Sequence, residues 1–136
     1  MSAASPRLAV VLATGELERF YSGLSLLVSS AAEGRSCAAL AVFRGLELLL
    51  DPDLLHRGLD PSDTPSLSWS GRDTFARSLY ELRETAFDLE ALSLYACSAS
   101  VDTMGLTTTD VDERLDGLRS TPRFLREASE ATLLFV

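Results

Sequence analysis

Short, mostly apolar runs alternate along this chain with longer segments whose apolar residues recur every three or four positions. The short runs are Leu8–Ala13, Ala38–Phe43, Ser93–Ala96 and Leu133–Val136. Apolar runs of this length are typical of strands that are buried on both faces of a parallel sheet. A weaker run, Leu115–Arg119, predicts one further short strand.

The segments between these runs have the spacing of amphipathic helices. One face of the segment from Leu17 to Ala31 is apolar, and Gly34 is placed to end that helix. Arg72–Leu89 repeats the pattern, and Thr121 with the following proline predicts the start of a last helix. Strands alternating with helices predict a single α/β domain over residues 1–136, a three-layer α/β/α sandwich with a mainly parallel sheet of about five strands.

The segment Leu46–Leu55 carries more leucines than one helix face buries, so part of it is predicted to contact another subunit. Gly58–Gly71 is predicted to be one long irregular segment, and Trp69 within it is a candidate interface residue. We therefore expect a homo-oligomer, most simply a dimer or a trimer.

The charge balance narrows the range of partners. The chain has 20 acidic and 12 basic residues, and a net charge of −8. Nucleic acids and anionic membranes both require a basic face, so neither is expected as a partner. All the basic residues are arginines, which excludes Schiff-base chemistry on lysine. His56 is the only histidine, too few for a multi-histidine metal site, and we expect neither a metal nor a cofactor.

The amino-terminal residues lack the charged, apolar and cleavable pattern of a signal peptide. Leu8–Ala13 is too short to cross a bilayer. We therefore expect a soluble, cytoplasmic protein. Cys37 begins the second predicted strand and Cys97 ends the third, so their Cα atoms are expected about 20 Å apart. That separation forbids a disulfide, which tolerates at most about 7 Å.

The stretch Leu92–Gly105 has the most informative chemistry. A predicted strand stops at Cys97, and small polar residues, among them Ser98 and Ser100, follow it. This order places the thiol at the carboxyl edge of the sheet, where open α/β sheets bind ligands. The free N–H groups of a following helix favour a thiolate, and both serines can donate hydrogen bonds to it. The alternative is a buried cysteine that acts as a small apolar residue, and position alone leaves both interpretations open.

Three further residues are expected at the same edge. Thr14 and Gly15 follow the first strand, and Arg44 follows the second. A single glycine matches neither a dinucleotide-binding fingerprint nor a phosphate-binding loop. Arg44 is either a solvated charge, the receptor of an anionic ligand or a support for the thiolate.

Several thiol chemistries do not fit the surroundings of Cys97. A thioredoxin-type site requires a second cysteine three positions on, where Ser100 stands. A cysteine phosphatase requires an arginine at the end of the loop, where Thr103 stands. A hydrolytic triad would have to recruit His56 from a distant segment. A single thiol that carries a group, notably sulfur as a persulfide, remains.

The chain resembles the DsrE/DsrF-like family, which includes the DsrEFH and TusBCD sulfur-relay proteins, and looks closest to the small stand-alone DsrE-like proteins. The stretches that carry the resemblance are Val11–Arg19, Phe43–Leu46, Tyr95–Ser98 with Asp102 and Met104-Gly105, and Phe124–Ala131 running into Leu133–Val136. The resemblance implies a five-stranded, mostly parallel sandwich and an assembly of two, three or six subunits. It also implies that Cys97 is the cysteine that carries a persulfide.

Three functions therefore remain open. The first is a sulfur carrier or sulfurtransferase that uses Cys97 and exchanges sulfur with other relay proteins. The second is a non-catalytic structural subunit of a relay complex, with Cys97 buried and inert, as in the many family members that lack the cysteine. The third is a small-ligand-binding protein that uses Thr14, Gly15 and Arg44.

Overall fold

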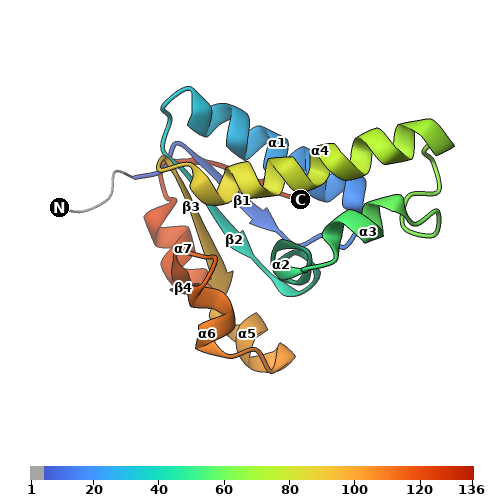
Figure 1. Ribbon diagram of the computed structural model, residues 1–136. Helices are drawn as coiled ribbons and strands as arrows, with labels where there is room; N and C mark the ends of the chain where they lie inside the picture. Colours follow the sequence, from blue (N-terminus) through green and yellow to red (C-terminus); the bar gives the residue numbers. More distant parts are fainter. Residues whose placement is uncertain (1–4) are drawn as a thin grey trace.

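The computed structural model describes residues 5–136, which form one five-stranded sheet with helices on both faces (Figure 1). All neighbouring strands are parallel, and their order is β4-β3-β2-β1-β5. The strands are β1 (Leu8–Leu12), β2 (Cys37–Ala41), β3 (Leu92–Cys97), β4 (Gly117–Arg119) and β5 (Thr132–Phe135). The helices of the described range are α1 (Leu17–Ala32), α2 (Phe43–Leu50), α3 (Leu54–Leu59), α4 (Trp69–Asp88), α5 (Ser98–Met104), α6 (Thr108–Asp112) and α7 (Thr121–Glu127).

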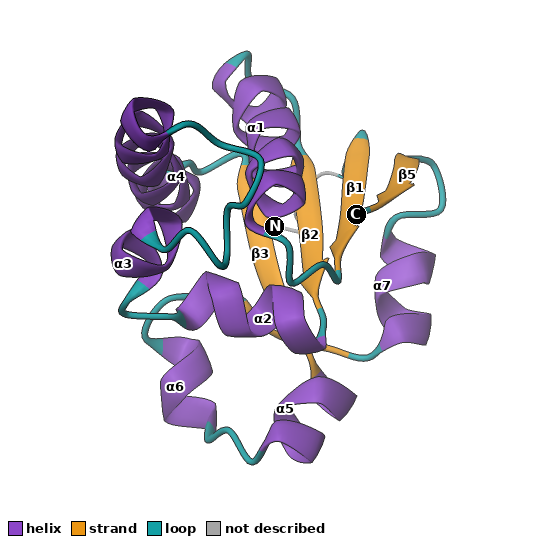
Figure 2. Cartoon of the chain, turned by 90° about the vertical axis from the view of Figure 1, so that its right-hand side faces the viewer, coloured by secondary structure: helices purple, strands orange, loops and turns teal. Residues whose placement is uncertain are grey.

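The predicted three-layer α/β/α sandwich is confirmed. Helices α1 and α4 lie on one side of the sheet, and α7 lies on the other (Figure 2). Because side chains alternate along a strand, Ala39 of β2 faces the larger core under α1, whereas Ala38 and Leu40 face α7. No helix within residues 5–136 is both long and apolar enough to cross a membrane.

The junction between β2 and α2 differs from the prediction. Phe43 was expected to end the strand, but it begins α2, and its backbone φ is +42°. The next turn of α2 packs directly on the end of β1. A Cβ atom at Gly45 would lie 2.1 Å from the carbonyl oxygen of Leu12, so only glycine fits there. The close contact forces the chain to turn within one residue of β2.

The leucine-rich segment packs mostly within its own chain. Leu46, Leu48, Leu49 and Leu54 are all buried within the chain. The segment forms two helices that turn at Pro52, and each buries its own apolar face. The leucines of this segment therefore no longer support a homo-oligomer, which remains a prediction. Trp69 is the first residue of α4 and not part of a loop, and its side chain is 82% exposed.

Helix α7 leaves part of its face of the sheet exposed. Phe124 and Ala128 are buried, but Leu125 is 44% exposed, and Phe135 of β5, in the run that was predicted to be buried, is 74% exposed. Strand β5 lies at the edge of the sheet, and the seven residues of α7 cover only part of that face. Ser120, and not Thr121, caps α7, because the Ser120 hydroxyl accepts a hydrogen bond from the Arg123 N–H at 3.3 Å.

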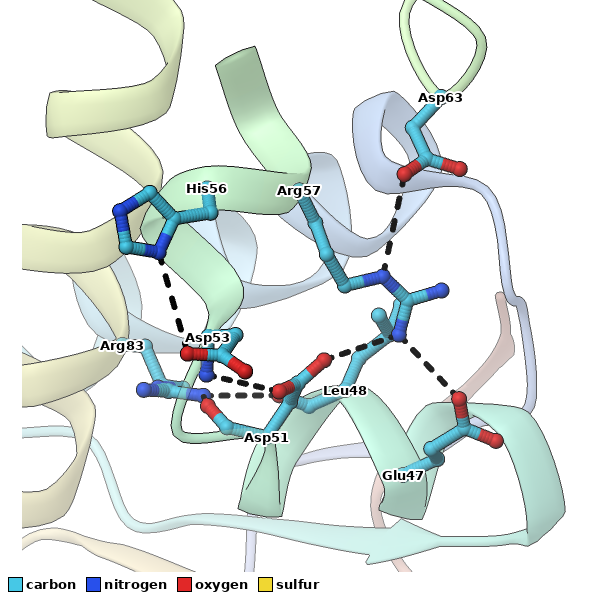
Figure 3. Close-up of polar contacts among 8 residues, drawn as sticks. All are labelled: Glu47, Leu48, Asp51, Asp53, His56, Arg57, Asp63 and Arg83. Carbon is cyan, nitrogen blue, oxygen red and sulfur yellow. Dashed lines mark hydrogen bonds and ion pairs between the residues drawn. The ribbon is translucent and has the colours of Figure 1, made fainter. Parts of the chain in front are cut away.

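A cluster of charged residues joins α2, α3 and α4 (Figure 3). The guanidinium of Arg83 donates to the carbonyl oxygens of Leu48 and Asp51, at 2.9 and 2.6 Å. Arg57 forms ion pairs with three carboxylates, those of Glu47, Asp51 and Asp63. His56 belongs to the same cluster and lies 3.8 Å from the Asp53 carboxylate. The only histidine is therefore part of this cluster and does not support Cys97.

Candidate functional site at the carboxyl end of β3

Cys97 occupies the junction that the sequence predicted. It is the last residue of β3 and the N-cap residue of α5, with extended backbone angles. Its side chain faces the smaller core under α7, and the residue is only 4% exposed. Cys37 begins β2 and faces the opposite layer. Both cysteines are free, which confirms that they form no disulfide with each other.

Hydrogen-bond donors converge on the Cys97 sulfur. Burial raises the pKa of this thiol, but the N–H groups of Ser100 and Ala99 and the hydroxyls of Ser100 and Thr121 outweigh burial and lower the pKa below its ordinary value. The Cys97 side chain makes no capping hydrogen bond to α5. A site of this kind favours a negatively charged sulfur at its centre.

Ser100 has the most constrained position among these donors. The residue is fully buried, and its hydroxyl oxygen accepts a hydrogen bond from the Phe43 N–H at 3.0 Å. The same hydroxyl is among the groups that lower the pKa of Cys97. Phe43 has a positive φ, which is rare for a residue with a side chain. Ser100 thus ties the start of α2 to Cys97.

The other predicted site residues form a second group. Arg44 lies over Gly15, since a Cβ atom at Gly15 would be 2.8 Å from the Arg44 Cδ. The Thr14 hydroxyl accepts a hydrogen bond from the Glu16 N–H at 3.0 Å, at the start of α1. These three residues meet at the ends of β1 and β2, as expected. Neither Arg44 nor Ser98 is among the groups that lower the pKa of Cys97.

Sequence reasoning missed two residues near the thiol. Thr121, which was expected only to start the last helix, supplies a hydroxyl that lowers the pKa of Cys97. Arg119 is the register partner of Cys97 on β4. The weak run Leu115–Arg119 could have pointed to both residues. A strand that pairs with β3 brings its last residues to the same edge of the sheet as Cys97. Within residues 5–136, no group of three or more His, Cys, Asp or Glu side chains is arranged to hold a metal ion.

Ser100→Ala is expected to raise the pH at which Cys97 becomes reactive. The variant removes a donor that stabilises the thiolate, so the midpoint of the pH profile of iodoacetamide alkylation moves upward. The measurement uses a Cys37→Ser background, in which Cys97 is the only thiol. Ser98→Ala is the matched control and is expected to leave the midpoint unchanged. Equal midpoints in the two variants would contradict the role of Ser100.

No protein-family model matches this chain, and no curated protein matches it with significant similarity.

Proposed function

We propose that this protein is a cytoplasmic sulfur carrier of the DsrE/DsrF-like type, which holds a persulfide on Cys97 and exchanges it with other sulfur-relay proteins. The observation that carries the proposal is the set of donors around one buried sulfur, which lowers its pKa despite burial. A structural cysteine has no need of such donors, and burial alone makes a thiol inert.

The chemistry requires no general base beside the thiol. The Cys97 thiolate attacks the sulfane sulfur of a donor, a new S–S bond forms on Cys97, and the donor leaves with the electron pair of its broken S–S bond. The persulfide that results is itself an anion at neutral pH. The same N–H and hydroxyl donors then stabilise its negative charge.

A non-catalytic structural subunit is the second candidate, and the burial of Cys97 favours it. At 4% exposure, the thiol meets a sulfur donor only if the cover over it opens. Thr121, at the start of α7, is part of that cover. The two candidates differ in whether folded Cys97 reacts at all.

Sulfur loading tests the proposal directly. Reduced protein is incubated with polysulfide or thiosulfate, and its intact mass is measured. Wild-type protein and Cys37→Ser are both expected to gain sulfur, whereas Cys97→Ser gains none. Cys37 is a suitable control because it is also a buried free cysteine but lies in the other layer. If wild type gains no sulfur and its Cys97 resists alkylation in the folded state, the structural subunit takes the place of the carrier.

A further inference from the structure

A cavity of about 270 Å³ lies between α7 and the amino-terminal halves of β2 and β3. On the sheet side it is lined by Ala38 and Ser93, which are register partners on the face that α7 covers. On the helix side it is lined by Phe124 and Ala128. Among the described residues, Cys97 does not line this cavity, so the cavity is a second site, apart from the thiol at the carboxyl end of β3.

The guanidinium of Arg119 is fixed at the wall of this cavity. Arg119 ends β4, but its guanidinium lies 4.0 Å from the centre of the Tyr95 ring, further back along the sheet. The Arg119 Nε donates to the Glu127 carboxylate at 2.8 Å, and Nη1 donates to the Leu118 carbonyl at 2.9 Å. Arg119, Tyr95 and Glu127 all line the cavity. Because these contacts already order the cation, a ligand does not have to order it on binding.

The cavity has hydrogen-bond donors that the protein does not use. Within residues 5–136, no hydrogen-bond acceptor is found for Nη2 of Arg119, and no partner is found for the hydroxyl of Ser93. Both residues line the cavity. Ser93 precedes Tyr95 by two residues on β3, so the two side chains share a face of the sheet. A guanidinium donates only, so the group that it requires from a ligand is an acceptor.

The local charge favours a ligand with a single negative charge. Arg119 and Arg123 share the carboxylate of Glu127, with Nε atoms at 2.8 and 3.5 Å. Two guanidinium groups and one carboxylate leave a local charge of +1. In a chain with net charge −8, one local positive charge balances a monoanion but leaves a dianion repelled.

The rest of the cavity is apolar and small. Phe124, Ala128 and Ala38 are all buried, and they offer hydrocarbon surface to whatever enters. Covering such surface with an apolar group stabilises a complex. The volume of about 270 Å³ has room for about nine groups of the size of a water molecule. A ligand that fits is therefore compact.

We propose that this cavity binds a small monocarboxylic acid with a compact apolar body, of the size of an aromatic or branched-chain acid. The carboxylate accepts hydrogen bonds from Nη2 of Arg119, with the Ser93 hydroxyl as a further donor. The apolar body packs between the sheet and Phe124. The proposal does not rest on sulfur chemistry, because Cys97 takes no part in it.

Benzoate and benzamide test the proposal, because they have nearly the same shape and differ in charge. Dissociation constants are measured by titrating the full chain and following its amide chemical shifts. Wild-type protein is expected to bind benzoate about 10-fold more tightly than benzamide, the lower end of the effect of a hydrogen bond to a charged group. Arg119→Gln is expected to remove this preference and to leave benzamide binding nearly unchanged.

Three further variants place the effect in this cavity. Arg123→Gln removes an arginine that shares Glu127 but does not line the cavity, so it is expected to lower the preference for benzoate less than about 3-fold. Ser93→Leu fills the cavity and is expected to abolish the binding of both probes. Cys97→Ser is expected to leave both affinities unchanged.

Circular dichroism checks the fold of each variant. If Arg119→Gln does not fold, the comparison of the two probes in wild type and the loss of binding in Ser93→Leu decide the matter. Equal affinity of wild type for the two probes, equal loss of preference in the two arginine variants, or binding that survives Ser93→Leu overturns the proposal. Loss of benzoate binding in Cys97→Ser also overturns it, because the acid would then bind at the thiol.

Discussion

Arg83→Ala is expected to lower the free energy of unfolding by about 3–5 kcal/mol, the range for a truncation that leaves both a cavity and unpaired polar groups. Arg83 is 1% exposed, and it is the largest side chain that is fully buried. It donates to two carbonyl oxygens near the end of α2, those of Leu48 and Asp51. Removing the guanidinium leaves both carbonyls without this donor.

Two variants separate the causes of that loss. Arg83→Met fills most of the volume but cannot donate, so it is expected to lose about 1–3 kcal/mol. Arg77→Ala is the control on the same helix; its side chain is exposed and pairs with Asp73, so its loss is expected to stay below about 0.5 kcal/mol. Urea unfolding followed by circular dichroism measures all three. Equal losses for Arg83→Ala and Arg77→Ala would show that Arg83 does not hold α2 and α4 together.

The parts of the fold that follow from local pattern were predictable. Alternation of apolar runs with amphipathic segments identified the parallel strands and the long helices. Gly34, with φ +88°, follows the end of α1 as expected, and Gly105, with φ +70°, ends α5. Each of these features depends on residues close together in sequence. Local rules therefore suffice for them.

The errors share a physical cause, since each depended on which elements lie side by side. The leucines of α2 and α3 exceeded what one helix face can bury. The sequence did not show that the segment divides into two helices at Pro52 or that α4 covers them. Leu133–Val136 looked like a buried strand because composition does not distinguish an edge strand from a central one. Phe43 looked like the end of a strand, since an aromatic residue rarely adopts a positive φ.

In the candidate site, too, local features were predictable and long-range contacts were not. Cys97 and Ser100 were predictable because a strand–helix junction brings residues three apart together. Thr121 and Arg119 were not, because only the pairing of β4 with β3 brings them to the thiol. The pairing of two strands that are distant in sequence thus brings the Thr121 hydroxyl and the Arg119 side chain to the end of β3.

Loading of Cys97 is expected to be all-or-none among the cysteine variants, which makes it the largest functional effect. A single thiol that carries sulfur holds at most one persulfide sulfur, and no second cysteine substitutes for it, because Cys37 faces the other layer. Burial and the surrounding donors are expected to protect the persulfide in the folded protein. Unfolding removes both and exposes the persulfide to cleavage by small thiols.

The most direct measurement of the central claim is therefore the sulfane sulfur that stays with the protein after loading. Cys37→Ser protein is loaded with thiosulfate or polysulfide, freed of excess donor, and assayed by transfer of its sulfur to cyanide, in parallel with the Cys37→Ser/Cys97→Ser double variant. The account predicts one transferable sulfur per folded chain, lost on unfolding in the presence of thiol and absent from the double variant. Equal sulfur in both proteins, or none in either, would contradict it.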